Sequence, residues 1–184
     1  MQQKEGIKVS GKITIRSHKA GTLHLYKSLV DLGKIELARE LLADDKVEVQ
    51  NSNIIVDSSN YGIDILVQYL LSAYNGSFSF PLGIAWGELG TGNTTPTAGD
   101  TALTTPTNRA PVAYAADNGF NTAQIQFFFP DAVLANEDYY ECGSFIGGSS
   151  SIGSGNMFNH ALFSSPYSKS AGTDTTLEID ISFA

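Results

Sequence analysis

Two acids that flank a pair of tyrosines are the residues of this sequence best suited to acid–base chemistry. Asp138 and Glu141 lie on either side of Tyr139 and Tyr140, and two carboxylates that share one site can hydrolyse a glycosidic bond. Residues 138–146, however, have the pattern of a strand, in which side chains three positions apart point to opposite faces. We therefore expect surface acids at a strand entrance rather than a catalytic pair.

The histidines do not form a metal-binding motif. His18 and His24 flank an expected turn, and His160 lies far from both along the chain, whereas a zinc site needs at least three protein ligands. We expect exposed or hydrogen-bonded histidines. The ligand spacing of a calcium-binding loop is also missing from the three acids that could converge on a cation, Glu88, Asp100 and Asp117. The sequence predicts no metal, no cofactor and no catalytic residue.

Two glycine-rich segments raise the question of phosphate binding or nucleophilic catalysis. Residues 87–92 contain three glycines, but no lysine follows them as a phosphate-binding loop requires. We interpret this segment as a backbone turn that leaves a strand. Residues 147–155 lack the Gly-x-Ser-x-Gly pattern of a nucleophile elbow and are expected to form a flexible loop suited to partner contact.

Charge is unevenly distributed along the 184 residues. Residues 1–50 contain nine Lys and Arg against seven acids, whereas residues 51–184 contain two against twelve, in a chain of net charge −8. An acidic body disfavours nucleic acid as a partner, because a phosphate backbone binds clustered cations. The acidic surface serves solubility, or the unlike ends of neighbouring subunits dock head to tail; both interpretations stay open.

Cysteine content and hydropathy indicate where this chain is made and whether it is inserted in a membrane. Cys142 is the only cysteine, so an intrachain disulfide is impossible and the residue is expected to be a small buried hydrophobe. No stretch approaches the ~18 apolar residues of a membrane span. Near the amino terminus, the first lysine is not followed by the apolar run that a secretion signal contains. We expect a chain that is made in the cytoplasm and is not inserted in a membrane.

The amino-terminal part is expected to contain a hairpin and two short helices. Strict alternation over residues 6–16 predicts a strand, which a turn at 19–21 would join to a second strand over 22–26. Apolar residues then recur at helical spacing over about 31–43. After an extended segment over 47–56, several N-cap residues precede a second helix that ends near Ala73.

The rest of the chain is expected to be sheet and loops. One or two strands are predicted over 77–88, and a long polar loop over 90–108 follows them. Further strands are predicted at 109–116, 122–129, 138–146, around 158–164 and, most clearly, 177–183. Strands at such regular spacing indicate a sandwich or barrel. We predict one mainly β (α+β) domain over 1–184: an antiparallel β-sandwich or jelly-roll-like body (77–184) with an N-terminal hairpin and two short helices (1–76).

Short motifs follow one another in a recognisable order over about residues 53–184. The first half contains Asn53-Ile54-Ile55-Val56, Gly83-Ile84-Ala85, Gly90-Thr91-Gly92, Pro96, Asp100-Thr101-Ala102-Leu103 and Arg109. The second half contains Glu141-Cys142-Gly143-Ser144-Phe145, interpreted as a turn, Met157-Phe158-Asn159-His160-Ala161, Lys169 and the strand 177–183. This order resembles a family of small virion structural proteins of tailed bacteriophages.

The resemblance implies a non-catalytic virion component of the tail, collar, fibre or head surface. It would assemble as homo-oligomers and contact copies of itself and other virion proteins through loops 90–108 and 147–157. Arg109, if buried, needs a carboxylate or carbonyl partner, and Asp100 and Lys169 are further structural or interaction candidates. An alternative is a carbohydrate- or host-receptor-binding module whose stacking platforms would be Trp86, Tyr139, Tyr140 and Tyr167. A glycosidase that uses Asp138 or Glu141 is the least favoured hypothesis.

Overall fold

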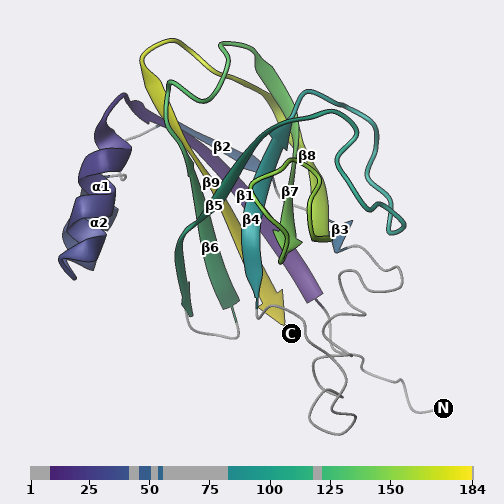
Figure 1. The fold of residues 1–184 in the computed structure, drawn as a ribbon, viewed down its shortest axis with the longest axis horizontal. Helices are drawn as coiled ribbons and strands as arrows, with labels where there is room; N and C mark the ends of the chain where they lie inside the picture. Colours follow the sequence, from purple (N-terminus) through teal and green to yellow (C-terminus); the bar gives the residue numbers. More distant parts are fainter. Residues whose placement is uncertain (1–8, 42–45, 51–53, 56–82, 118–121, 184) are drawn as a thin grey trace, which may run out of the picture.

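Seven long antiparallel strands form one nearly closed, barrel-like sheet (Figure 1). The computed structural model describes residues 9–41, 46–50, 54–55, 83–117 and 122–183. The long strands are β1 (Val9–Lys19), β4 (Ile84–Gly90), β5 (Pro106–Asp117), β6 (Thr122–Phe129), β7 (Asp138–Ile146), β8 (Asn156–Ser168) and β9 (Thr173–Phe183). Two short strands, β2 (Lys46–Gln50) and β3 (Ile54–Ile55), and two helices, α1 (Thr22–Asp31) and α2 (Ile35–Leu41), complete the described elements. The predicted mainly β, antiparallel fold with two short helices is confirmed.

The strand order explains why the sheet curls into a barrel rather than forming two separate layers. Neighbours in the sheet follow the order β2-β1-β9-β6-β5-β4-β7-β8-β3, and every neighbouring pair is antiparallel. The ends of this order approach one another, since β2 contacts β8 and β1 contacts β3. Strand β5 pairs with both β4 and β6 and so joins the strands β2, β1, β9 and β6 to the strands β4, β7, β8 and β3.

The core lies inside the barrel and is built by alternation along the strands. On β9, Leu177, Ile179 and Ile181 are buried because they occupy the inward positions of a period-two strand. Phe127 and Phe129 of β6 and Tyr139 of β7 join them in the core. Cys142 is also completely buried, as expected of a small hydrophobe. The sequence prediction of a strand over 177–183 is confirmed, although the strand begins four residues earlier.

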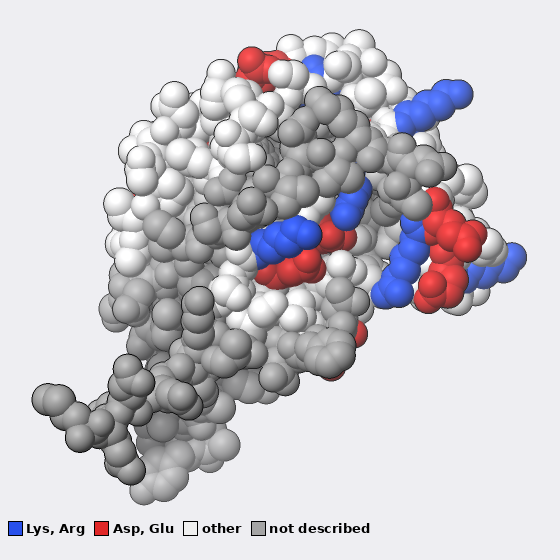
Figure 2. All heavy atoms as spheres, turned by 180° about the vertical axis from the view of Figure 1, so that it is seen from behind, with Lys and Arg blue, Asp and Glu red and all other residues white. Residues whose placement is uncertain are grey.

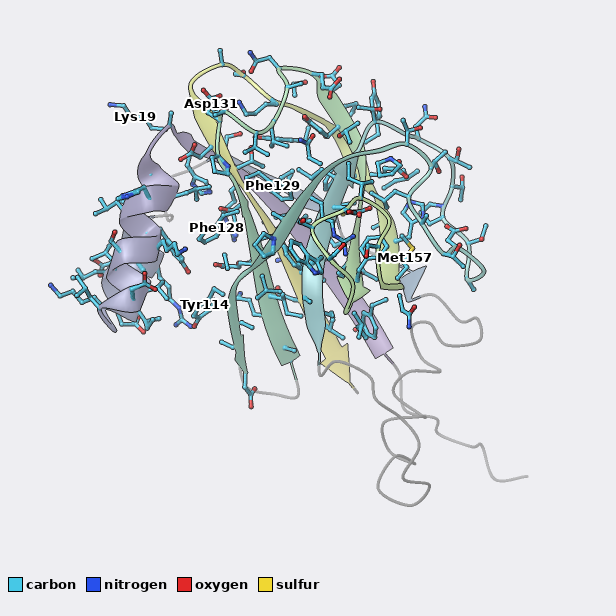
Figure 3. All side chains as sticks on the ribbon, in the orientation of Figure 1. Lys19, Tyr114, Phe128, Phe129, Asp131 and Met157 are labelled. Carbon is cyan, nitrogen blue, oxygen red and sulfur yellow. The ribbon has the colours of Figure 1, made fainter. Side chains whose placement is uncertain are left out.

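The two helices pack on the outer face of β5 and β6. Tyr26 of α1 meets Phe128 edge to face, with ring centroids 4.6 Å apart, and its hydroxyl donates to Gln126 on β6. Arg39 of α2 donates a hydrogen bond to the hydroxyl of Tyr114 on β5. In Figure 3, Tyr114 and Phe128 lie on the side of the barrel that faces the helices, and Met157 lies on the opposite side.

The prediction of a hairpin strand over 22–26 is wrong, because this segment is the first half of α1. The N–H groups of Gly21 and Leu23 donate to the carboxylate of Asp174, which lies on β9. This distant acid satisfies amide groups that a helix start leaves free. Apolar residues at 23 and 26 then face the protein at helical spacing.

The helix predicted over 31–43 is also only partly correct. Leu32 ends α1, Gly33 follows with φ of +70°, and α2 begins at Ile35. A left-handed residue at this position stops a helix at little cost only when it is glycine. The second predicted helix, ending near Ala73, lies outside the described residues, as does most of the segment 77–83.

Charged side chains are mixed rather than segregated on the face shown in Figure 2. Basic and acidic groups lie together both over the helices at the edge and nearer the middle of this face. Arg16 on β1 pairs with Glu178 on β9 at 3.1 Å, and Arg39 pairs with Glu36 within α2 at 3.5 Å. Among the described helices, none is long and apolar enough to span a membrane.

Candidate functional site beneath the polar loops

Glu141 on β7 is a completely buried acid that binds the backbone of the loop formed by residues 91–105. Its Oε1 accepts hydrogen bonds from the N–H groups of Gly92 at 3.2 Å and Thr105 at 2.7 Å. Its Oε2 accepts from the N–H of Thr104 at 3.0 Å. A single carboxylate therefore holds both ends of this loop against the sheet.

His160 on β8 connects this acid to a second one. The Nε2 atom of His160 lies 2.9 Å from Oε2 of Glu141, and the Nδ1 atom lies 2.6 Å from Oδ2 of Asp100 in the loop. Asp100 also accepts hydrogen bonds from the N–H and hydroxyl of Thr97. Because both ring nitrogens face carboxylate oxygens, both carry protons, and the ring is an imidazolium.

Electrostatics agrees with this charge state. Burial disfavours the charged ring, but the hydrogen bonds to Glu141 and Asp100 outweigh it and raise the pKa of His160 above its ordinary value. Burial likewise opposes ionisation of Glu141, yet the ring and the loop N–H groups hold the pKa of this acid below its usual range. Burial also opposes ionisation of Asp100, but the hydrogen bonds from Thr97, followed by the one from His160, lower the pKa of this acid.

A second buried ion pair holds the loop formed by residues 147–155. Glu88 on β4 lies directly opposite Arg109 on β5, and the two side chains form a salt bridge that is 0% and 1% exposed respectively. Arg109 also donates to the carbonyl of Ser154, and Glu88 accepts from the N–H of Gly153 at 2.7 Å. Figure 1 shows this loop and the loop 91–105 on the side of the barrel away from α1 and α2; we call them the two polar loops.

Aromatic rings cover the guanidinium of Arg109. Its central carbon lies 5.1 Å from the ring centroid of Trp86 and 4.8 Å from that of Phe145, within the range of a cation–π interaction. Trp86 packs in turn against a small cluster of Leu103, Phe145 and Met157. A buried Arg109 was expected to need a carboxylate or a carbonyl partner, and it has one of each, Glu88 and the carbonyl of Ser154.

Glycines beneath the loops allow the close approach of these groups. A Cβ on Gly92 would lie 2.5 Å from Oε1 of Glu141, and one on Gly90 would lie 2.6 Å from the carbonyl oxygen of Thr105. A Cβ on Gly87 would meet the ring of Phe127 at 2.5 Å. The prediction of a turn that leaves a strand over 87–92 is only partly correct, since β4 continues to Gly90 and the chain leaves the strand at Thr91. Gly87 and Gly90 lie within β4, where the neighbouring atoms leave no room for a side chain.

The arrangement offers no converging ligands and no activated nucleophile within the described part of the chain. His160 separates Glu141 from Asp100, so their oxygens do not point to one cation, and no group of three metal-ligating side chains occurs among the residues described. Ser144 is buried and bonded to Asn159 rather than to a base. The expectation that Asp138 and Glu141 face opposite sides is wrong, because the strand is irregular between Tyr139 and Glu141 and the neighbours of both acids, Tyr139 and Cys142, point into the core. The two acids still share no site, since Asp138 is exposed and Glu141 is buried beneath the loop 91–105.

Of the remaining sequence candidates, Lys169 lies outside this site. Its side chain is fully buried and donates to Asp131 and, at 2.8 Å, to the carbonyl of Ser170, so it holds the segment 130–137 instead. The pKa of Asp131 is lowered by the hydrogen bond to this lysine. Tyr140 is half-buried and contributes to neither buried pair.

The predicted aromatic stacking platform is largely contradicted. Tyr139 is 0% and Tyr167 is 1% exposed, because their rings pack 6.3 Å apart inside the barrel. Burial raises the pKa of Tyr139 to about 12, and its hydroxyl bonds to Asn108 and to the carbonyl of Ala135. Neither ring is available to a sugar at the surface.

Sequence reasoning named Arg109 and Asp100 but missed the two acids that complete the site. The expectation that Glu141 is a surface acid at a strand entrance is wrong, because its side chain is completely buried. The sequence suggested only a cation-ligand role for Glu88, and this role was not predicted. The motif over 141–145 is strand, not the expected turn, and the register that sets Gly143 opposite His160 brings the acid to the histidine. The glycines of β4 were the available signal, because glycine inside a strand often marks a close approach.

Comparisons of this chain with protein-family models, with curated proteins and with solved structures found no match in any of the three.

Proposed function

We propose that this protein is a non-enzymatic structural subunit of a tailed-bacteriophage virion that binds neighbouring subunits through the two polar loops. The observation that carries the proposal is the use of the buried charges. Glu141, His160, Glu88 and Arg109 all direct their hydrogen bonds to loop residues or to each other. Groups that could perform catalysis are thus engaged in fixing the shape of two surface loops.

Such loops suit protein recognition. Most residues of both loops are exposed, and their side chains are mainly Ser, Thr, Asn and Gly. A surface that is ordered before binding loses less conformational entropy on association than a mobile one. The assignment to a virion, in the tail, collar, fibre or head surface, rests on the ordered motifs, several of which meet at this site.

The first experiment measures assembly. Size-exclusion chromatography with light scattering should find homo-oligomers, and antibodies raised against the protein should label particles of the phage that encodes it. Bulky charged substitutions at exposed loop positions, Thr94→Arg and Ser150→Arg, should weaken assembly, whereas Ala115→Arg on the exposed part of β5 should not. A strict monomer that never enters particles would overturn the proposal.

Of the four residues named as stacking platforms for the alternative partner, a host glycan or receptor, Trp86 and Tyr140 are the two that are not fully buried. One face of Trp86 is already covered by Arg109, which leaves little ring surface for stacking. Glycan-array binding that is lost in Tyr140→Ala but kept in Thr94→Arg would favour this alternative over a loop-mediated subunit contact.

A further inference from the structure

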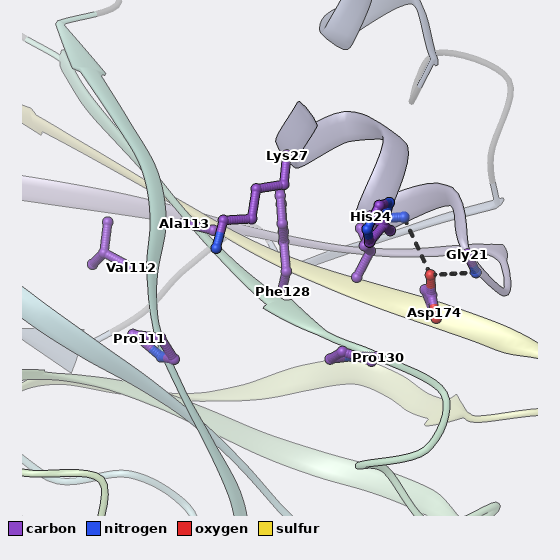
Figure 4. A pocket seen from close by; sticks show the side chains of 10 residues that line it. Gly21, His24, Lys27, Pro111, Val112, Ala113, Phe128, Pro130 and Asp174 are labelled. Atoms are coloured by element: carbon purple, nitrogen blue, oxygen red, sulfur yellow. Dashed lines mark hydrogen bonds between the residues drawn. The ribbon is translucent and has the colours of Figure 1, made fainter. Parts of the chain in front are cut away.

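A cavity of about 530 Å³ lies between α1 and the strands β5 and β6, on the side of the barrel away from the two polar loops. Figure 4 shows Lys27 and His24 on α1 facing this space across from Pro111 and Val112 of β5. Leu23 and Phe128 add apolar walls. The volume lies within the range of cavities that bind small organic ligands.

The rim of this cavity carries a lysine and a histidine whose side chains have no partner among the described residues. Within the part of the chain that the structure describes, the side chains of Lys27 and His24 form neither a hydrogen bond nor an ion pair. Asp174 is the acid among the lining residues, but its oxygens accept N–H groups of Gly21 at 2.9 Å, Leu23 at 3.2 Å and Asp131 at 2.9 Å. This carboxylate is therefore engaged with the backbone.

We propose that this cavity binds a compact amphipathic anion, namely an aromatic or branched hydrocarbon with one carboxylate or sulfonate group. The hydrocarbon would displace water from the walls formed by Leu23, Val112 and Phe128. The anionic group would accept a charge-assisted hydrogen bond from the ammonium of Lys27, with His24 one helical turn away. This site is independent of the assembly role proposed above, which uses the opposite side of the barrel.

The test compares two fluorescent probes with the same ring system. One is 8-anilinonaphthalene-1-sulfonate, and the other is N-phenyl-1-naphthylamine, which lacks the sulfonate. Lys27→Gln should weaken binding of the sulfonate probe about fivefold, the effect of one partly screened charge, and should leave the neutral probe unchanged. The matched control is Lys34→Gln, an exposed lysine that does not line the cavity.

A second pair of variants locates the probes. Ala113 lines the cavity from β5, whereas Ala115, two residues further along the same strand, does not. Ala113→Trp should fill the space and abolish binding of both probes, and Ala115→Trp should not. Absence of saturable binding, equal effects of the two lysine variants, or unchanged binding in Ala113→Trp would each overturn the proposal.

Discussion

Glu141→Gln is the change that tests the candidate site most directly, because it keeps the shape of the side chain and removes its charge. The amide oxygen of glutamine would still accept the N–H groups of Gly92 and Thr105. Its amide nitrogen, however, would face the N–H of Thr104 and the protonated Nε2 of His160, both of which are donors. Two donors would then be left unsatisfied in a buried position.

The magnitude follows from these contacts. Removing one partner of a buried charged pair costs about 3–5 kcal/mol, much of it the desolvation of the group left behind. Asp100 still faces the other nitrogen of His160, which keeps part of the stabilisation, so we expect a loss of about 3 kcal/mol. For a chain of this length, that loss lowers the melting temperature by roughly 6–12 °C.

Urea denaturation followed by the fluorescence of Trp86 measures this free energy of unfolding. The buffer should be at about pH 6, where a histidine of raised pKa is charged. Glu40→Gln, at an exposed position of α2, is the matched control and should change stability by less than about 0.5 kcal/mol. If Glu141→Gln costs no more than this control, Glu141 does not hold the loop in the way its contacts suggest.

Four further outcomes follow from the same contacts. Because folding raises the pKa of His160 above its ordinary value, the contribution of this histidine to stability is complete at lower pH and is lost as the pH rises through the raised pKa. The free energy of unfolding should therefore fall with rising pH over that range. An equally steep fall in His160→Gln would contradict this. Arg109→Met leaves a buried carboxylate unpaired and should cost about 3–5 kcal/mol in the same denaturation assay; a loss below about 1 kcal/mol would argue against the pair. Gly92→Ala would place a Cβ 2.5 Å from Glu141 and should lower the free energy of unfolding by about 1–3 kcal/mol. Gly99→Ala, where the nearest neighbour of the new Cβ is 4.0 Å away, should be nearly neutral. Similar losses in both variants would show that Gly92 is not crowded by Glu141. Asp174→Ala should cost about 1–2 kcal/mol and accelerate amide hydrogen exchange at the start of α1; unchanged exchange there would show that the helix start does not depend on this acid.

The strands were the most predictable part of the fold because their signal is local. The predicted ranges 122–129 and 138–146 coincide with β6 and β7, and the long loop between the expected strands is present as residues 91–105. Alternation along one strand is enough to reveal its buried face. The closure of these strands into one barrel depends instead on pairings between distant segments, which no local pattern contains.

Helix α1 was missed for a physical reason of the same kind. Its first amides are satisfied by Asp174, an acid on β9 more than 150 residues away along the chain. The N-cap residue of α1 is Gly21, which has no side chain to accept a hydrogen bond from the first turn. Alternating leucines at 23 and 25 then favoured a strand. A helix start that depends on tertiary contact is invisible to local capping rules.

Only some members of the candidate site were predictable from the sequence, and their arrangement was not. Arg109 and Asp100 were singled out by their motifs. His160 was expected to be either exposed or hydrogen-bonded, and it is buried and hydrogen-bonded. The pairing of Glu141 with His160 depends on the register between β7 and β8, and that of Glu88 with Arg109 depends on the register between β4 and β5. Such registers are set by the packed barrel as a whole.

Stability alone does not explain why these charges are buried. A buried ion pair can often be replaced by apolar residues without loss of stability, because desolvation offsets the attraction between the charges. What apolar residues cannot provide is a set of hydrogen-bond acceptors for the loop backbone. Here the carboxylates of Glu141 and Glu88 accept hydrogen bonds from four loop N–H groups. Long loops without secondary structure need such bonds to adopt one shape. The buried charges therefore fix the shape of the two polar loops, which is the surface that our proposal assigns to subunit contact.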